Sequence, residues 1–422
     1  MKEKTIHDPI HGSMRLSGLV LDLVDTPEVQ RLRRIKQLGL ANLVFPGANH
    51  TRFEHVLGTA HLAERLGGEL GLSQEELDLL VAAAVLHDVG HAPYSHTLEY
   101  LMTDHLDQGH MELTGDVLRG EASTCTPEEI EVLEDLGAPR IVDVLSDHEI
   151  DPDEVARLLL GENEKPYLGQ IIHSDIDIDQ MDYLLRDSHF TGVALGRIDI
   201  DRLMRTLKIS EDQLVIESKG VEAVEGLLTA RALMYSSVYF HHTTRIAELM
   251  VTNAVNHALS EDTPITKQNF YRMSDEELSE RLYEIPGYPR EMIMRIRYRQ
   301  LFKTAYLEER QKLEADEKEN ILKTYGEWHL IQEKQEEIAE KAGVSEGKVI
   351  LDVPIVDILI SEPRIEKVEI PVKTEKGLSK LSDISTLAPA LRERQAPRYL
   401  IRVATPAEHV KAVKKVLPEA LE

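Results

Sequence analysis

The sequence is poor in cysteine and has no long apolar run. Its single cysteine, Cys125, excludes an intramolecular disulfide framework and any metal site built from several cysteines. No apolar run reaches the roughly 18 residues that would indicate a membrane span. The first residues, MKEKTIHDPIHG, also lack the apolar centre of a signal peptide. We therefore expect a cytoplasmic protein without a membrane partner.

Positive charge is scarce as well. Lys and Arg number 48 against 75 Asp and Glu, which gives a formal net charge of -27. Nucleic acids and anionic membranes bind positively charged surfaces, so we expect neither as a partner. A negatively charged small substrate stays possible if basic residues converge locally. The segment QRLRRIKQLG (30–39) is one such concentration, although a solvated helix face would have the same composition.

The chain is long enough for more than one domain, because 422 residues exceed the usual size of a single compact core. Most of the first 300 residues show helical periodicity. In LSQEELDLLVAAAVLHDVGHAP (72–93), Ser73 and Glu76 form an S-x-x-E capping box, and Gly90 and Pro93 are expected to end the helix. Residues 219–259 predict one or two further helices, and residues 207–218 predict a small β-hairpin.

The composition changes after about residue 305. A Glu- and Lys-rich stretch at 308–341 predicts exposed helices. Beyond it, the segments 348–358, 367–373 and 398–405 are β-prone, and 406–417 is an amphipathic helix. We therefore expect a mainly α fold with three parts: a helical core at 1–305, a charged helical connector at 306–344 and a small α+β C-terminal lobe at 345–422.

The segment HDVGHAPYSH (87–96) carries the first chemical signal. The apolar stripe of the preceding helix runs into His87, Asp88 and His91, and a buried aspartate needs a cation or dense hydrogen bonding. A capping role for Asp88 and a core role for His87 would be the ordinary explanation of an isolated His-Asp pair. Three histidines in ten residues, with His55 upstream, favour a metal site instead. The zinc-protease pattern HExxH does not match, because residue 88 is Asp and Gly90 interrupts the spacer.

A second acidic cluster, SDIDIDQMDYLLRD (174–187), follows in the sequence. Most of its acids are expected to be solvated or paired with arginines such as Arg186, and one of them can complete a metal site. Two histidines and two carboxylates form a hard-to-borderline ligand set that suits Fe, Mn, Zn, Co or Mg. The cluster contains five aspartates: Asp175, Asp177, Asp179, Asp182 and Asp187.

These motifs resemble the HD superfamily of metal-dependent phosphohydrolases, whose H…HD…D pattern is present as His55, His87-Asp88 and Asp179. Within it, the chain resembles the SAM-and-HD-domain deoxynucleoside triphosphate (dNTP) triphosphohydrolases, without their SAM domain. The resemblance covers nearly the whole chain and rests on the segments 8–12, 25–39, 44–58, 87–96, 177–187 and 298–303. It implies a helical HD-domain core with a small α+β C-terminal lobe.

The resemblance also implies an activity, which is hydrolysis of a dNTP to deoxynucleoside and inorganic triphosphate. A divalent transition metal (Fe, Mn, Zn, Co or Ni) would be held by His55, His87, Asp88 and Asp179, with Mg²⁺ on the substrate phosphates. The implied catalytic residues are His91, His96, Glu99 and His110; Glu99 stands where the family commonly has aspartate. The implied substrate-binding residues are Gln37, Leu38, Arg52, His91, Tyr183, Asp187, Arg231, Tyr239 and His241.

Activation by dGTP and assembly into a homo-oligomer, a dimer or a tetramer, are further implications of the resemblance. The matching activator-site residues are Asp25, Gln30, Arg33, Arg299 and Lys303. One departure stands out: Gln180 replaces a phosphate-binding lysine of the animal enzyme. It leaves open another HD phosphatase or phosphodiesterase, acting on nucleoside monophosphates or cyclic nucleotides. A catalytically idle nucleotide sensor is the third possibility, although the intact ligand set argues against it.

Overall fold

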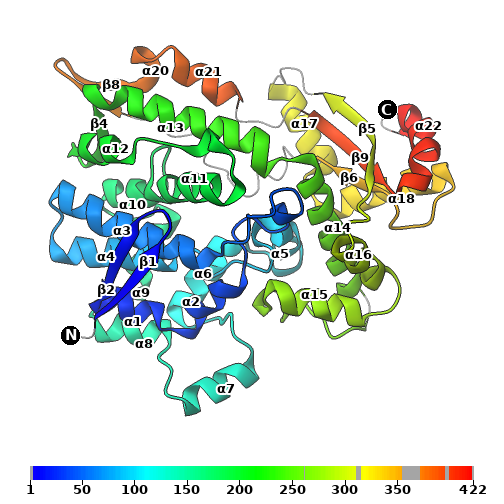
Figure 1. Ribbon diagram of the computed structural model, residues 1–422, viewed down its shortest axis with the longest axis horizontal. Helices are drawn as coiled ribbons and strands as arrows, with labels where there is room; N and C mark the ends of the chain where they lie inside the picture. Colours follow the sequence, from blue (N-terminus) through cyan, green and yellow to red (C-terminus); the bar gives the residue numbers. More distant parts are fainter. Residues whose placement is uncertain (1–2, 261, 310–314, 354–370, 395–398, 421–422) are drawn as a thin grey trace.

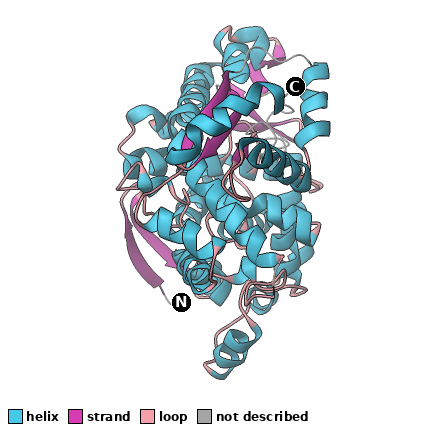
Figure 2. Ribbon diagram, turned by 90° about the vertical axis from the view of Figure 1, so that its right-hand side faces the viewer, coloured by secondary structure: helices cyan, strands magenta, loops and turns pink. Residues whose placement is uncertain are grey.

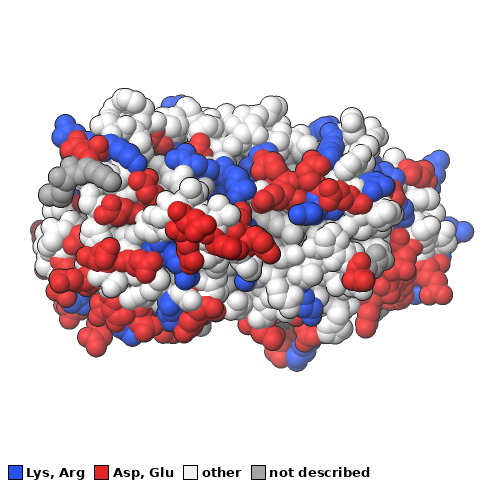
Figure 3. All heavy atoms as spheres, turned by 90° about the horizontal axis from the view of Figure 1, so that it is seen from below, with Lys and Arg blue, Asp and Glu red and all other residues white. Residues whose placement is uncertain are grey.

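The structure is a computed structural model that describes residues 3–260, 262–309, 315–353, 371–394 and 399–420. It confirms a mainly α fold with a small α+β part toward the C-terminus (Figures 1 and 2). Among the described residues, no helix is long and apolar enough to cross a membrane. The face drawn in Figure 3 carries many acidic side chains with basic ones interspersed, in keeping with the acidic composition.

The N-terminal half begins with a β-hairpin that the helical periodicity did not predict, β1 (Glu3–Asp8) paired with β2 (Gly12–Ser17). Helices follow it up to residue 206: α1 (Gly18–Val24), α2 (Pro27–Arg31), α3 (Arg52–Leu70), α4 (Gln74–Leu86), α5 (Glu99–Leu106), α6 (His110–Arg119), α7 (Pro127–Asp135), α8 (Ile141–Asp147), α9 (Pro152–Leu160), α10 (Pro166–Ile172), α11 (Ile178–Thr191) and α12 (Ile200–Thr206). Helix α7 protrudes from the body in both views.

The second half combines helices and strands. The predicted hairpin is confirmed as β3 (Leu207–Ser210) and β4 (Gln213–Glu217). The predicted helical stretch at 219–259 forms two helices joined by a π-helical turn at Tyr235–Tyr239. These and the remaining elements are α13 (Val221–Met234), α14 (His242–Leu259), α15 (Asp275–Glu284), α16 (Tyr288–Arg297), β5 (Lys303–Glu309), α17 (Ala315–Tyr325), α18 (Trp328–Ala342), β6 (Ile350–Asp352), β7 (Pro371–Thr374), β8 (Gly377–Lys380), α20 (Leu381–Ile384), α21 (Leu387–Arg394), β9 (Tyr399–Thr405) and α22 (Val410–Ala420).

The strands form two larger sheets that connect distant parts of the sequence. One has the order β3-β4-β7-β8, in which β4 and β7 run parallel, and the other has the order β5-β9-β6. Figure 1 shows them at different ends of the long dimension of the molecule. Strand β5 crosses the expected limit at residue 305, and the three-part division of the chain stays a prediction. Of the expected β-prone segments, residues 354–358, 367–370 and 398 lie outside the described residues.

Helix α4 ends directly before two of the expected metal ligands, His87 and Asp88. Its capping box is present, since the Ser73 amide donates to Glu76 Oε2 at 2.8 Å and the Glu76 amide donates to Ser73 Oγ at 3.3 Å. The expected end at Gly90 is wrong, because the helix stops at Leu86 and His87 forms its C-cap. The next residues make a tight turn in which the His91 amide donates to the Asp88 carbonyl at 3.1 Å. His91 therefore does not share a helix face with His87.

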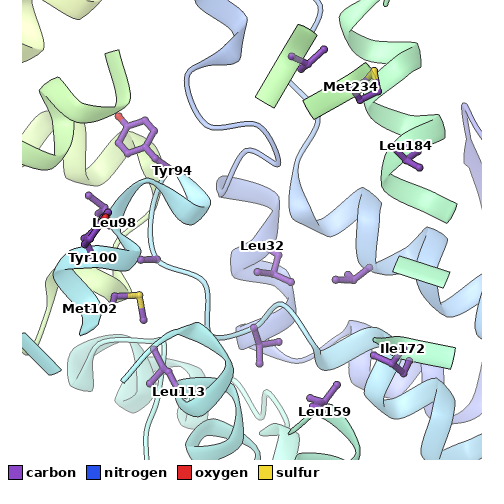
Figure 4. Packing of buried hydrophobic residues seen from close by; sticks show 14 of the residues in the cluster. Leu32, Tyr94, Leu98, Tyr100, Met102, Leu113, Leu159, Ile172, Leu184 and Met234 are labelled. Carbon is purple, nitrogen blue, oxygen red and sulfur yellow. The ribbon is translucent and has the colours of Figure 1, made fainter. Parts of the chain in front are cut away.

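Packing around α4 is dense, because its last two turns are buried on every side. Apolar side chains from many elements form one interior cluster with it, and Figure 4 shows Leu32, Leu113, Leu159, Ile172, Leu184 and Met234 of this cluster. Close packing of this kind holds the ends of α3, α4 and α11 in fixed relative positions. The expected metal ligands lie at or next to those helix ends.

Helix α3 packs tightly against side chains of α11 at Gly58. A Cβ atom there would lie 1.9 Å from Asp182 Oδ1 and 2.5 Å from an Arg186 guanidinium nitrogen. Asp182 and Arg186 form a fully buried ion pair with Nε–Oδ2 at 2.8 Å. Only glycine leaves room at this position for the ion pair.

We predict that Gly58→Ala lowers the free energy of unfolding by about 2–4 kcal/mol, because the methyl group displaces a buried ion pair. Gly68→Ala on the same helix is the matched control. Nothing lies within 4 Å of a Cβ at Gly68, so this change should leave stability equal or raise it by about 0.5 kcal/mol. Urea unfolding of both variants measures the difference, and equal midpoints would contradict this account of Gly58.

Candidate metal and active site

Two histidine rings face each other where α3 and α4 meet. His55 lies in the first turn of α3, and its Nε2 is 3.2 Å from Nε2 of His87. The other ring nitrogen of each is hydrogen-bonded from behind: His55 Nδ1 to Asp182 Oδ2 at 2.8 Å and His87 Nδ1 to the Ala84 carbonyl at 3.0 Å. Donation from Nδ1 leaves a lone pair on each Nε2. Two lone pairs at this distance repel unless a proton or a metal cation lies between them.

Two carboxylates lie beside the facing nitrogens. Asp179 Oδ1 is 2.9 Å from His55 Nε2 and 3.8 Å from His87 Nε2. Asp88 Oδ1 is 3.4 Å from His87 Nε2, and Asp88 Oδ2 is 3.9 Å from His55 Nε2. The four residues thus offer two nitrogen and two oxygen donors around one point, which fits a divalent transition metal.

The electrostatics of this donor set also favour a cation. Burial would lower the pKa of His55, but its contacts with the Asp179 and Asp182 carboxylates outweigh burial and raise the pKa to about 10. Without a metal, His55 therefore holds a proton on Nε2, and a bound metal ion would displace that proton. Burial would raise the pKa of Asp88, yet Arg52, His87 and His91 hold it well below its usual range. The ligand carboxylates are therefore ionised near neutral pH, and the site attracts positive charge.

Asp182 anchors the site from behind. It is fully buried and accepts from three side chains: His55, His11 at 2.7 Å and Arg186 at 2.8 and 2.9 Å. Arg186 also donates to Asp8 Oδ2 at 2.7 Å, which ties the N-terminal hairpin to α11. Sequence reasoning treated Asp182 only as one acid in a cluster. Its position three residues after Asp179 and four before Arg186 was the available signal.

The other expected acids of the 174–187 cluster have separate roles. Asp177 caps α11, since its Oδ1 accepts from the Gln180 amide at 2.7 Å. Asp187 accepts from the Tyr239 hydroxyl at 2.7 Å and lies 2.7 Å from His50 Nε2. The expectation was that most of these acids are solvated or paired with arginines such as Arg186: the pairing holds for Asp182, but Asp175, Asp177, Asp182 and Asp187 are all buried and not solvated.

A second cluster lies next to the metal ligands and contains His91, His96, Glu99 and His110, whose donor atoms lie within 4.8 Å of one another. Glu99 Oε1 is 2.8 Å from His110 Nδ1 and also accepts from the His110 amide at 3.0 Å. Burial opposes ionisation of Glu99, but His110 lowers the pKa of Glu99 to about 2. The carboxylate raises the pKa of His110 against the effect of burial. The pair is therefore ionic, and it lies beside His96.

His96 itself is held as a neutral imidazole in the free protein. His96 is exposed in the cleft, where desolvation by the surrounding protein atoms, then Arg52 and His110, lower its pKa to about 4. The ring packs edge-on against His91 with centroids 4.8 Å apart and against His110 at 5.4 Å. His96 lines the cavity, so a ligand there can reach it.

Two cavities meet at this cluster. The larger, about 520 Å³, holds three of the expected metal ligands (His87, Asp88 and Asp179) together with Arg231. The smaller, about 190 Å³, is lined by aromatic and apolar side chains that include Leu38 and Tyr239. Five residues line both: Gln37, Arg52, His96, Glu99 and Tyr183. The cavities thus form one cleft with a charged end and a largely apolar end.

Most of the expected substrate-binding residues line this cleft. Arg52 contacts Asp88 Oδ2 at 2.7 Å and donates to Ser95 Oγ at 2.7 Å. Gln180 does not simply replace a lysine: its amide nitrogen donates to the Ser174 carbonyl at 2.6 Å, and its oxygen accepts from Arg231 at 3.4 Å. His241 is not among the residues that line either cavity, and its contact with a base stays a prediction.

The residues expected at an activator site lie on separate surface elements. Asp25 pairs with Lys4 at 2.8 Å, and Arg33 lies 3.5 Å above the Phe53 ring while donating to Gln30. Arg299 follows α16 and donates to the Leu43 carbonyl at 3.2 Å. Lys303 is exposed at the start of β5. No nucleotide position follows from these contacts alone.

Sequence reasoning missed the far end of the apolar cavity. Phe240, Thr244, Arg245 and Glu248 line it, three of them from α14. Their positions repeat every three to four residues, a spacing that a buried helix face produces as well. The sequence pattern therefore does not distinguish these four cavity residues from an ordinary buried helix face.

Two family models match the chain. The HD domain model matches residues 52–187, and the HD associated region model matches residues 198–422, which is more than half of the chain. The chain therefore belongs to the HD-domain phosphohydrolase family, as the motifs indicated.

Relatives with and without an assigned activity are similar to it. The uncharacterized protein MJ1154 of Methanocaldococcus jannaschii is 32% identical over 98% of this chain and 81% of that protein. The deoxynucleoside triphosphate triphosphohydrolase SAMHD1 homolog of Dictyostelium discoideum is 30% identical over 71% of this chain, and the alignment spans 59% of that relative. A hypothetical protein from Aquifex aeolicus has a similar crystal structure, with a TM-score of 0.70, 30% identity, and coverage of 99% of this chain and 100% of that chain.

We predict that Asp179→Ala removes the metal. Only three of the four ligands would remain, and one of the two negatively charged carboxylates would be lost. Purified protein should retain less than about a tenth of the wild-type metal content, measured by mass spectrometry after dialysis. Asp116→Ala on α6 is the control, since that carboxylate pairs only with Arg119 near the surface. Full occupancy in Asp179→Ala would show that another aspartate of the cluster is the ligand.

Proposed function

We propose that the protein hydrolyses dNTPs to deoxynucleoside and inorganic triphosphate. The observation that carries this proposal is the single cleft in which the metal-ligand set, the His96 cluster and an aromatic-lined cavity adjoin. A dNTP has the matching order of parts: a charged triphosphate, a scissile bond and an apolar sugar and base. The similarity to dNTP triphosphohydrolases supports the same substrate class.

The charged end would bind the triphosphate. A divalent metal held by His55, His87, Asp88 and Asp179 would supply Lewis-acid polarisation at the phosphate that is attacked. Arg52 and Arg231 donate charge-assisted hydrogen bonds to the remaining phosphate oxygens, and His91 lies beside them. Gln180 accepts from Arg231 and so helps to orient that guanidinium, in a position where a lysine would instead contact phosphate directly.

His96 would protonate the leaving 5′-oxygen. Its low pKa in the free protein owes much to Arg52, whose charge the bound triphosphate would offset. Substrate binding would therefore raise the pKa of His96, so that the ring takes up a proton from solvent and then donates it to the leaving 5′-oxygen. The Glu99–His110 ion pair lies beside His96 and orients it.

The apolar end would bind the deoxyribose. Gln37 and Leu38 lie at its entrance, and Tyr183 and Tyr239 pack edge to face with centroids 6.1 Å apart. The Tyr239 hydroxyl is fixed by its hydrogen bond to Asp187. A wall held in this way leaves little space for a 2′-hydroxyl, so deoxynucleotides would be preferred.

Product analysis tests the proposal directly. Metal-loaded protein incubated with dGTP should release deoxyguanosine and triphosphate in equal amounts, as resolved by ion-exchange chromatography. Release of dGMP and pyrophosphate would refute the proposed reaction. Turnover of nucleoside monophosphates or cyclic nucleotides alone would favour the phosphatase or phosphodiesterase alternative, and no turnover with any metal would favour a nucleotide sensor.

We further propose activation by a guanine nucleotide bound at Asp25, Gln30, Arg33, Arg299 and Lys303, in a homo-oligomer. Addition of dGTP should then raise the rate of dATP hydrolysis and increase the particle mass measured by light scattering. Arg33→Ala should lose both responses and keep the unstimulated rate. An identical rate and mass with and without dGTP would refute activation and leave the hydrolytic reaction untouched.

A further inference from the structure

The apolar end of the cleft terminates in two charged side chains that the proposed reaction does not use. Arg245 and Glu248 lie one turn apart on α14 and line the smaller cavity. Their side chains are 11% and 15% exposed, and Arg245 NH1 lies 3.7 Å from Glu248 Oε2. Charged groups in a largely apolar cavity are costly to desolvate unless they meet a polar partner. A ligand group can be that partner.

The Glu248 carboxylate lies next to the residues proposed to contact the sugar. A Cβ atom on Gly39 would be 3.5 Å from Glu248 Oε1, and Gly39 directly follows Gln37 and Leu38. Glu248 and Arg245 line only the smaller cavity, whereas the metal-site residues line the larger one. The charged pair is therefore positioned beyond the sugar, on the side away from the phosphates.

The same end of the cavity offers a face for stacking. Phe240 lines it, and the Arg245 guanidinium carbon is 6.0 Å from the Phe240 ring centroid. Thr244 also lines it, and its buried hydroxyl has no hydrogen-bond partner among the described residues. An aromatic ring, a hydroxyl, a carboxylate and a guanidinium together form a suitable surface for a planar polar ring.

Arg245 is held in place from the C-terminal part of the chain. Its NH2 donates to Asp352 Oδ1 at 3.0 Å, and the Tyr399 hydroxyl donates to Asp352 Oδ2 at 2.6 Å. Arg402 lies 3.5 Å from the same carboxylate and stacks on the Tyr399 ring at 3.8 Å. Asp352 is 2% exposed. A buried carboxylate with three partners fixes the orientation of the guanidinium that lines the cavity.

We infer that Arg245 and Glu248 read the edge of a guanine base and make dGTP the preferred substrate, with Asp352 as a positioning residue for Arg245. The inference rests on the proposed function. Guanine carries adjacent N1–H and N2–H donors that match the two oxygens of a carboxylate, and its O6 accepts from a guanidinium. Adenine and cytosine offer one amino donor beside a ring acceptor, and thymine has a single N–H between two carbonyls. With any of those three bases, at least one hydrogen-bonding atom of Arg245 or Glu248 would lack a complementary donor or acceptor on the base.

Steady-state kinetics with the four dNTPs test the inference. Every assay contains saturating GTP, so that the proposed activator site is filled to the same extent. We expect kcat/KM for dGTP to exceed that for the other dNTPs by roughly tenfold or more, mainly through KM. Equal values for all four, with triphosphate released from each, would overturn the inference and leave the proposed function intact.

Calorimetric binding of deoxyguanosine and deoxyadenosine gives a readout that needs no turnover. Wild-type protein should bind deoxyguanosine more tightly, and Glu248→Gln should remove most of the difference. This comparison isolates the cleft, because the proposed activator residues are unchanged in the variant. If no dNTP yields triphosphate, the proposed function fails, and the binding comparison still decides whether the cleft reads guanine.

Two variants separate recognition from structural support. Glu248→Gln should remove most of the preference for dGTP, so that kcat/KM for dGTP falls roughly tenfold relative to kcat/KM for dATP. Asp352→Asn should raise KM for dGTP and leave KM for the other dNTPs unchanged, whereas a merely structural role would impair all four equally. Glu222→Gln, on the exposed face of α13, is the matched control and should keep the wild-type preference. If Asp352→Asn does not fold, Arg245→Lys replaces it, and an unchanged preference in either variant or in Glu248→Gln overturns the inference.

Discussion

The hydrogen bond from His55 Nδ1 to Asp182 determines what the facing histidine pair can do. With Nδ1 held as the donor, Nε2 of His55 turns its lone pair toward Nε2 of His87, 3.2 Å away. Asp182 can stay ionised in the interior only because Arg186 is buried beside it, and Arg186 in turn requires Asp8. A chain of charges thus runs from the N-terminal hairpin to the candidate metal site. The packing of α3 against α11 holds this ion pair in place, because a side chain larger than that of glycine at Gly58 would overlap it.

The cleft derives its order from the same packing. The ends of α3, α4 and α11 supply charged groups to one end. The π-helical turn supplies aromatic groups to the other end, and α14 supplies Thr244, Arg245 and Glu248 there. Arg52, His96 and Tyr183 line both ends, so they mark the boundary where a phosphate gives way to a sugar. The proposed dNTP substrate has a matching order of parts, with an anionic triphosphate at one end and a planar base at the other.

Local patterns in the sequence predicted the parts of the molecule that depend on local physics. The capping box at Ser73, the hairpin at 207–217 and the density of histidines near Asp88 are all short-range features. The end of α4 was predicted too late, because tertiary packing around Leu86 and the turn at His87 replaced helical bonds that periodicity alone would continue. Contacts such as His11 with Asp182 or Arg245 with Asp352 join residues far apart in the chain. They leave no periodic signal. The spacing of Asp182 from Asp179 and Arg186 could suggest a shared helix face, but its contacts with His11 and His55 required the folded structure.

The parallel pairing of β4 with β7 has a consequence for how the protein is made. Ile216 pairs with Val372, and strand β9, near the end of the chain, lies between β5 and β6. A chain emerges from the ribosome starting at its N-terminus, and long-range strand pairing is slow. The edges of β4 and β5 therefore stay unpaired until the last segments have been synthesised. Unpaired edges of this kind attract other strands, which makes the nascent chain most prone to aggregate during that interval. Tyr399 and Asp352 can complete their contacts with Arg245 only after this interval. The Arg245 end of the cleft is therefore among the last parts of the molecule to form.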